Sequence, residues 1–402
     1  MRRVLFVDDE PSILDGLRRM LRPRRKEWDM VFAAGGPEAL EAAEASSFDV
    51  VVTDMKMPGM DGAELLKRFQ EQHPETVRFV LSGHAELESV MRAVPVAHQF
   101  LMKPCDADTL KEAVSRACEL RSLLDNDRAE EFIGTLEALP SRPEMYTAIL
   151  EAIANPEVEI KSVVAILASD VAMSAKLLQL VNSAFFGLPQ HIADVSQAVT
   201  LLGFNMIRDL VLSVEVFRPP PDAAVGLEKF LASLQTCSMW TGNIAAQMFD
   251  DKEMGSRAFT AGLLHDVGLL VMATQLPDVL SDAVERSRTN GQPLHVVEEE
   301  LHGVSHAEIG AYLLGVWGLP YPMLEAAAYH HRPSALPQES FGELAAVHVA
   351  SALVESRIAT GSENSGAEID LAYLESLGVR DRLEEWENLV DREMGSPGDD
   401  QR

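Results

Sequence analysis

The chain has 402 residues, more than one ordinary hydrophobic core organises, so two or three domains are expected. Its composition is that of a globular protein, and no apolar stretch approaches the roughly 20 residues of a membrane span. A formal net charge of −29 disfavours DNA binding, and the one basic cluster, at residues 18–26, is typical of a solvated surface. Because the N-terminus has no signal-peptide pattern and the three cysteines are scattered, we expect a cytoplasmic protein without disulfides.

Short apolar runs alternate with amphipathic helical stretches over the first 120 residues. Ile13, Leu14 and Leu17, for example, recur on one face at helical spacing. Strands interleaved with helices predict an α/β fold, a doubly wound five-stranded parallel sheet with helices on both faces. The predicted strands are Val4–Val7, Met30–Ala33, Val50–Thr53, Arg78–Leu81 and Gln99–Met102.

Reactive side chains follow the carboxyl ends of these strands, which is where ligands bind in open α/β sheets. Asp8 and Asp9 follow the first strand, Asp54 follows the third, and Ser82 and Lys103 follow the last two. Three carboxylates at one edge repel one another, so a hard divalent cation such as Mg²⁺ is the expected partner. One carboxylate can then attack a phosphoryl group and form an aspartyl-phosphate, while cation and lysine neutralise the transferred oxygens.

The motifs at this edge resemble the receiver domain of bacterial response regulators, whose fold is flavodoxin-like. They read Val-Asp-Asp-Glu, Thr-Asp-Met-Lys-Met-Pro-Gly-Met-Asp-Gly, Leu-Ser-Gly-His-Ala and Phe-Leu-Met-Lys-Pro, and they span residues 2–120. The resemblance implies that Asp54 accepts a phosphoryl group from a sensor histidine kinase. It also implies that Asp9, Asp54 and the backbone carbonyl of Lys56 bind Mg²⁺ directly, whereas Asp8 acts mostly through water.

The same resemblance assigns the residues that respond to the phosphate. Ser82 and Lys103 contact the phosphate oxygens, and Phe100 stands where the family has its switch aromatic. Movement of these side chains would re-pack the face formed by the last strands and helices, and so carry the signal onward.

Everything after Asp106 has a helical pattern, and histidines concentrate in its second half. Seven of the eleven histidines lie between positions 265 and 348. The adjacent pair His265-Asp266 falls inside an apolar stretch, where both groups need hydrogen bonds or a metal ion. Ser305 and Glu308 predict a capping box, so a helix should begin at His306 and leave His302 outside it.

The residues around these histidines resemble the HDOD branch of the HD superfamily of metal-dependent phosphohydrolases. The resemblance covers about residues 131–335 and includes Val-Asn-Ser-Ala-Phe-Phe-Gly, Gly-Leu-Leu-His-Asp-Val-Gly and Tyr-His-His-Arg-Pro. It implies an all-α domain and a remnant of the HD metal site at His265, Asp266, His306 and His330. Two places that hold a histidine and an aspartate in catalytic members hold Cys237 and Ser351 here, and the Gly-Tyr-Pro signature of cyclic-di-GMP phosphodiesterases is absent.

Three interpretations of the His265-Asp266 region stay open. A hydrogen-bonded pair that fixes two helices is favoured over a bound transition metal without turnover, and that over real hydrolysis. His331 and His348 are assigned to helix surface or packing. The domains expected along the chain are 1–120, receiver; 121–132, helical linker; 133–335, HDOD domain; 336–394, C-terminal helical extension; and 395–402, disordered tail.

The sequence therefore predicts a response regulator that is phosphorylated on Asp54 and has an HDOD output without catalysis. This output would bind a protein partner whose identity the sequence does not indicate, and the chain is expected to form a homodimer. The alternative is an HD-type metal-dependent phosphohydrolase, for example a cyclic dinucleotide phosphodiesterase, controlled by the receiver.

Overall fold

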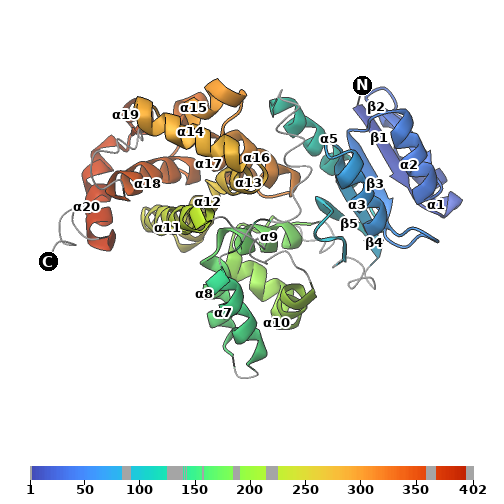
Figure 1. The fold of residues 1–402 in the computed structure, drawn as a ribbon, viewed down its shortest axis with the longest axis horizontal. Coiled ribbons are helices and arrows are strands. Elements are labelled where there is room, and N and C mark those ends of the chain that lie inside the picture. Colours follow the sequence, from blue (N-terminus) through green and yellow to red (C-terminus); the bar gives the residue numbers. More distant parts are fainter. Residues whose placement is uncertain are drawn as a thin grey trace.

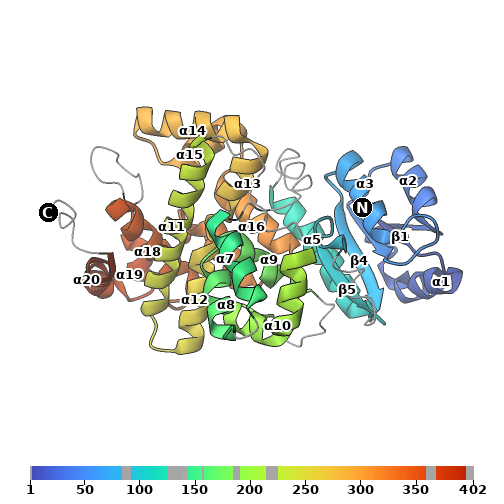
Figure 2. The same ribbon diagram turned by 60° about the horizontal axis from the view of Figure 1, so that its bottom comes forward.

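A computed structural model gives the fold of the chain in two parts, an α/β part at the N-terminal end and a larger helical part (Figure 1). The helical part lies on one side of the sheet, next to β5 (Gln99–Lys103) and α5 (Ala107–Leu124) (Figure 2). The structure describes residues 2–83, 92–124, 139, 141, 143–155, 158–183, 191–213, 225–358 and 368–394.

The α/β part is built on one parallel sheet, with strand order β2-β1-β3-β4-β5. The strands are β1 (Arg2–Val7), β2 (Trp28–Ala33), β3 (Val50–Asp54), β4 (Val77–Gly83) and β5 (Gln99–Lys103). All five predicted strands are confirmed, and so is the doubly wound α/β fold class. Residues 50–52 of β3 are fully buried, which explains why this strand has a continuous apolar run.

Among the described residues, the sheet is accompanied by α1 (Pro11–Met20), α2 (Gly36–Ala45), α3 (Gly62–Gln72) and α5 (Ala107–Leu124), together with the 3₁₀ turn η1 (Arg22–Arg24). α3 begins with an N-cap, because the Asp61 side chain accepts a hydrogen bond from the Glu64 amide at 2.9 Å. α5 packs against α16 (His306–Val316) of the helical part.

The described residues after 124 that form regular structure form helices alone, which confirms the predicted all-α second part. Ser305 and Glu308 form the predicted capping box, and the helix starts at His306. The α-helices are α7 (Pro143–Ala154), α8 (Ile160–Ala168), α9 (Val171–Val181), α10 (Val195–Ser213), α11 (Val225–Gln247), α12 (Lys252–Leu264), α13 (Val267–Gln275), α14 (Pro277–Asn290), α15 (Leu294–His302), α16 (His306–Val316), α17 (Tyr321–Tyr329), α18 (Glu343–Ile358), α19 (Leu371–Ser376) and α20 (Leu383–Met394), with the 3₁₀ turns η3 (Pro333–Ala335) and η4 (Arg380–Arg382).

The segment expected as a C-terminal extension packs back on the helical part. α18 contacts α11, α12 and α17, and Trp386 of α20 is fully buried with its ring stacked on Phe341 at 5.1 Å. The extension therefore shares the hydrophobic core with the helices before it. Most of the predicted linker, the triple proline at 219–221 and the predicted tail at 395–402 lie outside the described residues.

In the described part of the chain, no single helix combines the length and apolar character needed to cross a membrane. Two strongly bent helix pairs, α8 with α9 and the α12–α13 segment with α14, meet that test of length and composition only when joined.

Candidate functional site

The carboxyl edge of the sheet holds two buried carboxylates that share one ammonium group. Asp8 follows β1 and is 2% exposed, while Asp54 ends β3 and is 8% exposed. The Lys103 Nζ at the end of β5 donates a hydrogen bond to Asp8 Oδ2 at 2.8 Å and a second, short one to Asp54 Oδ1. Parallel strands end at the same edge, so three residues far apart in the sequence meet here as predicted from the sequence.

Charge and burial oppose each other in this pocket. Burial raises the pKa of Asp54, and the hydrogen bond from Lys103 opposes that rise without cancelling it. Burial also disfavours the charge of Lys103, but the hydrogen bonds to Asp54 and Asp8 outweigh it and raise the pKa of the ammonium. The Lys56 amide donates to Asp54 Oδ2 at 3.0 Å, so both oxygens of this carboxylate are held in place.

The donor set at this edge fits a hard divalent cation. Asp8 and Asp54 place two carboxylates around one ammonium, and the half-buried Asp9 follows directly. Carboxylate oxygens are the ligands that Mg²⁺ prefers in proteins. Asp8, Asp9 and Asp54 would hold the ion, and the backbone carbonyl of Lys56 stays a predicted fourth ligand.

The remaining predicted receiver residues lie on the two neighbouring strands. Ser82 of β4 and Phe100 of β5 are both fully buried, and Phe100 pairs with Val80 in the sheet. Gly62, from the Met-Asp-Gly motif, packs directly on the acceptor strand, because a Cβ atom there would lie 2.2 Å from the Asp54 carbonyl oxygen. This close approach explains why the motif has a glycine.

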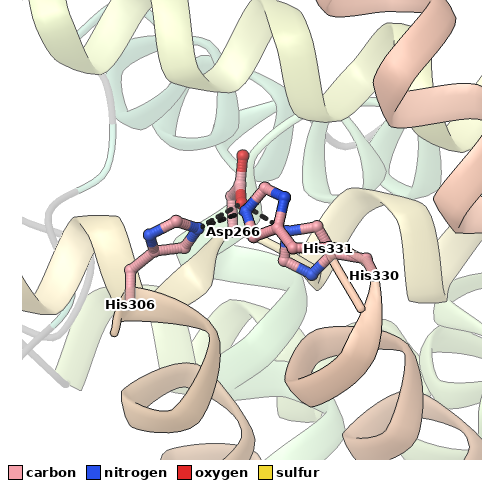
Figure 3. A group of neighbouring side chains, drawn as sticks. All are labelled: Asp266, His306, His330 and His331. Atoms are coloured by element: carbon pink, nitrogen blue, oxygen red, sulfur yellow. Dashed lines mark hydrogen bonds and ion pairs between the residues drawn. The ribbon is translucent and has the colours of Figure 1, made fainter. Parts of the chain in front are cut away.

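A second cluster lies in the helical part, around the carboxylate of Asp266. Asp266 is the N-cap of α13, His306 opens α16, and His330 and His331 follow α17. In Figure 3 the side chains of Asp266, His306, His330 and His331 point toward one another, and interactions meet at Asp266. Asp266 Oδ1 lies 3.4 Å from the Nε2 atoms of both His306 and His330.

His331 belongs to this cluster, which corrects its assignment to helix surface or packing. Its Nε2 lies 3.1 Å from His306 Nε2. Asp266, His306, His330 and His331 each offer one ligand atom, and these four atoms lie within 4.8 Å of one another. His265 is fully buried on the other side of the carboxylate, with Nε2 3.2 Å from Asp266 Oδ2.

Three of the imidazole rings are oriented by acceptors at their Nδ1 atoms. Nδ1 of His265 faces the Gly262 carbonyl at 2.6 Å, and Nδ1 of His330 faces the Ala327 carbonyl at 2.9 Å. Nδ1 of His306 faces the Glu298 carboxylate at 2.6 Å. Since an acceptor requires the proton on Nδ1, each neutral ring presents a bare Nε2 lone pair toward Asp266. Several acceptors therefore converge, and either protons or a metal ion must lie between them.

The charges in the cluster depend strongly on one another. Burial alone would raise the pKa of Asp266, but the charge and hydrogen bond of His265 outweigh it and hold that pKa well below its usual range. Burial also opposes the charge of His306, yet Glu298 and Asp266 raise its pKa well above the ordinary value. Burial lowers the pKa of His330 to about 4, so this ring is neutral and able to bind metal at neutral pH.

Two acidic residues near the cluster could not be recognised from the sequence. Glu298 of α15 is fully buried and accepts hydrogen bonds from both Nδ1 and the amide of His306. Glu355 lies one helical turn after Ser351 on α18, and burial together with the charge of Asp266 raises its pKa to about 7. The Ser351 hydroxyl donates to the His348 carbonyl at 3.2 Å, so Glu355 is the acidic group of α18 that interacts with the cluster.

The packing of helices around the cluster explains the roles of three other residues. A Cβ atom at Gly268, in the His-Asp-Val-Gly motif, would lie 1.9 Å from the His306 carbonyl oxygen, so α13 and α16 touch through their backbones. Burial first, and then the charges of Glu355 and Asp266, raise the pKa of the Cys237 thiol, which keeps it protonated near the cluster. His348 bonds the His330 carbonyl and the Asp370 amide, and thus has a packing role.

Comparison with known proteins identifies both parts of the chain. The family described as response regulator receiver domain matches residues 4–115, and the family described as HDOD domain matches residues 139–333. An uncharacterised protein of Treponema pallidum is 31% identical over 207 residues, which cover 51% of this chain and 40% of that protein. The chain thus spans about two fifths of that relative's length.

Two further similar proteins cover different shares of the chain. The sensory transduction protein RegX3 of Mycolicibacterium smegmatis is 31% identical over 157 residues, covering 39% of this chain and 67% of that protein. The crystal structure of the MmoQ response regulator from Methylococcus capsulatus covers 62% of this chain and 98% of its own, with 21% identity and a TM-score of 0.47. The chain belongs to the response regulators and combines an N-terminal receiver domain with a C-terminal HDOD domain.

Proposed function

We propose that Asp54 accepts a phosphoryl group from a sensor histidine kinase and that the HDOD domain transmits the resulting signal without catalysis, by binding a protein partner. The observation that carries the first half is the shared ammonium of Lys103, bonded to both Asp8 and Asp54. Lys103 thereby orients the Asp54 carboxylate at the end of β3. Its ammonium already lies where it can neutralise the oxygens of an incoming phosphoryl group.

The chemistry proposed for the receiver is a transfer between two nucleophiles. An Asp54 carboxylate oxygen attacks the phosphorus, the bond between phosphorus and the kinase histidine breaks, and the phosphoryl group stays on Asp54 as an acyl phosphate. Bound Mg²⁺ supplies charge neutralisation on the transferred oxygens. Lys103 contributes a hydrogen bond and a positive charge, and Ser82 contributes a hydroxyl next to the transferred group.

Labelling with acetyl phosphate tests this assignment. The Asp54→Asn variant should incorporate no phosphoryl group, because an amide is not a nucleophile for this reaction. The exposed Asp15 offers a matched control, and Asp15→Asn should label as the unchanged protein does. Labelling that persists in Asp54→Asn would place the acceptor elsewhere.

A second function, metal-dependent phosphodiester or phosphomonoester hydrolysis, is favoured by the four convergent ligand atoms at Asp266, His306, His330 and His331. Against it stand Cys237 and Ser351 at two places where catalytic HD proteins have ligands. Metal analysis of the purified protein, combined with a product assay on a cyclic dinucleotide, separates the two functions. Turnover that depends on metal and is lost in Asp266→Asn would replace the non-catalytic proposal.

Four further points stay predictions: the domain boundaries at 120, 132, 335 and 394, the homodimer, the cytoplasmic location, and the protein partner of the HDOD domain. Sedimentation of the full chain with and without beryllofluoride tests the dimer. Capture of partners on the phosphorylated and unphosphorylated full chain tests the output.

A further inference from the structure

Helices α16 and α17 form a hairpin whose two ends serve different parts of the molecule. α16 runs from His306 to Val316, and α17 runs back from Tyr321 to Tyr329, directly before His330 and His331. A helix rises about 1.5 Å per residue, so the closed end of the hairpin lies roughly 15 Å from the open end. Three of the four clustered ligand residues therefore lie at the open end, and Asp266 comes from the α12–α13 junction.

The closed end of the hairpin is docked on the receiver domain. Gln99 Nε2, at the start of β5, donates to the Val316 carbonyl at 2.9 Å. Arg116 of α5 donates a short hydrogen bond to the Leu319 carbonyl and lies over the Tyr321 ring at 4.8 Å. The last turn of a helix leaves carbonyls without intrahelical donors, and the receiver supplies donors at this end.

Helix α9 of the HDOD domain completes this interface from the other side. Gln179 Nε2 donates to the His98 carbonyl of the receiver at 2.9 Å, and Lys176 Nζ lies over the Trp317 ring at 4.8 Å. Gln179 and Trp317 are almost fully buried. Receiver, α9 and hairpin therefore pack as one unit around residues 316–321.

On the receiver side, β5 contacts both the hairpin and Asp54, the proposed phosphoacceptor. β5 has five residues, with Gln99 at its start, the buried Phe100 next to it, and Lys103 at its end, bonded to Asp54. A change in the bonding of Lys103 or in the packing of Phe100 acts on Gln99 through one continuous strand. This segment is paired along its length with β4.

At the open end, the Nε2 atoms of His306 and His330 lie 3.4 Å from the Asp266 carboxylate, and the Nδ1 atoms of the two rings face Glu298 and the Ala327 carbonyl. Imidazoles together with one carboxylate suit a divalent transition metal such as zinc or cobalt. Gly268 lets the backbone of α13 touch that of α16 at His306, so a shift of the hairpin acts directly on the helix that Asp266 caps.

We propose that the α16–α17 hairpin couples the two sites: docking of the receiver at residues 316–319 holds the Asp266–His306–His330–His331 cluster in a metal-binding arrangement, and phosphorylation releases it. The last clause rests on the proposed function, namely that Asp54 is the phosphoacceptor. The coupling itself depends only on the interface and the hairpin. By linkage, metal bound at the cluster must in turn favour the docked receiver.

Cobalt(II) titration of the full chain, followed by its visible absorption, tests the proposal. The unchanged protein should bind one equivalent, and His331→Gln should weaken binding about tenfold or more, whereas His73→Gln in the receiver should not. Gln99→Ala and Arg116→Ala, which touch no ligand, should each weaken binding about tenfold, in the range usual for coupled sites. Gln72→Ala and Arg380→Ala, at exposed positions, are the matched controls.

The outcomes separate the parts of the proposal. Failure of the unchanged full chain to bind cobalt at micromolar concentration overturns the metal site. Tight binding that Gln99→Ala and Arg116→Ala both leave unchanged overturns the coupling. If both interface variants weaken binding but beryllofluoride with Mg²⁺ does not, the coupling stands and phosphorylation control through Asp54 fails. Weaker cobalt binding in Gln99→Ala, in Arg116→Ala and after addition of beryllofluoride with Mg²⁺ supports both the coupling and its control by phosphorylation.

Discussion

Nε2 of His331 lies 3.1 Å from Nε2 of His306, although the two residues are 25 positions apart in the chain. His306 opens α16 and His331 follows α17, and the two rings meet beside the Asp266 carboxylate (Figure 3). Nδ1 of His306 faces Glu298, so a neutral His306 ring presents an unprotonated Nε2, whereas the imidazolium that Glu298 and Asp266 favour carries a proton there. The contact therefore needs a proton on one of the two facing nitrogens, or a cation that both nitrogens bind.

Glu298→Gln tests the part that orientation plays in this cluster. The carboxylate bonds Nδ1 of His306, which orients the ring, and also accepts from the His306 amide, so its neutral replacement should lower cobalt(II) affinity by about 10-fold to 100-fold, the range seen for groups that orient metal ligands. Glu300→Gln, two residues on and exposed, is the control and should bind as the unchanged protein does. Equal affinities in both variants would show that Glu298 does not orient a ligand.

Lys103→Met should destabilise the receiver as well as impair phosphorylation. The variant leaves the buried carboxylates of Asp8 and Asp54 without their shared counter-charge, and losing one partner of such a contact costs about 1–3 kcal/mol. Urea denaturation of the full chain without Mg²⁺ measures the loss in the free energy of unfolding. Lys67→Met, at an exposed position of α3, should change it little, and an equally small effect at Lys103 would contradict the shared ion pair.

Gly268→Ala and Gly16→Ala should change stability in opposite directions. A Cβ atom at Gly268 would lie 1.9 Å from the His306 carbonyl oxygen, so α13 and α16 must separate, at a cost of about 1–3 kcal/mol or more. Gly16 lies inside α1 with nothing within 4 Å of the added atom, and alanine there should stabilise by about 0.5–1 kcal/mol. Thermal denaturation of both variants checks the pair, and equal shifts would contradict the close helix contact.

Lys176 predicts a pH dependence of stability. Burial and the charge of Arg78 lower its pKa from 10.5 to about 7. Between these two values the unfolded chain holds a proton that the folded protein has released, so this residue's contribution to stability rises with pH across that window. The cost of its buried charge is therefore largest below pH 7.

Lys176→Met removes this dependence. The melting temperature of the variant should exceed that of the unchanged protein most at pH 6–7, and the difference should shrink as the pH approaches 10. Lys161→Met, at an exposed position of α8, should give no such trend. A difference between Lys176→Met and the unchanged protein that stays constant from pH 6 to 10 would show that Lys176 keeps its proton in the folded state.

The receiver site was readable from the sequence because of a property of parallel sheets. Strands that run in the same direction end at the same edge, so residues at the ends of β1, β3 and β5 lie along one edge, and the long side chain of Lys103 reaches past β4. Asp8, Asp54 and Lys103 follow those strands, and the structure brings them together. The start of α16 at His306 was also predictable, because Ser305 and Glu308 cap the helix within one turn.

The HDOD cluster depended on tertiary structure, because it is assembled from helix ends whose mutual positions no local pattern sets. His331 follows His330 directly, and only the path of the chain after α17 decides that both rings reach Asp266. Glu355 and Ser351 share a helix, and the way α18 packs decides which of them interacts with the cluster. Sequence by itself thus determined the two domains and predicted the phosphoacceptor, whereas helix packing alone decided which side chains form the cluster and how the HDOD domain contacts the receiver, because side chains from separate helices converge only after the core has formed.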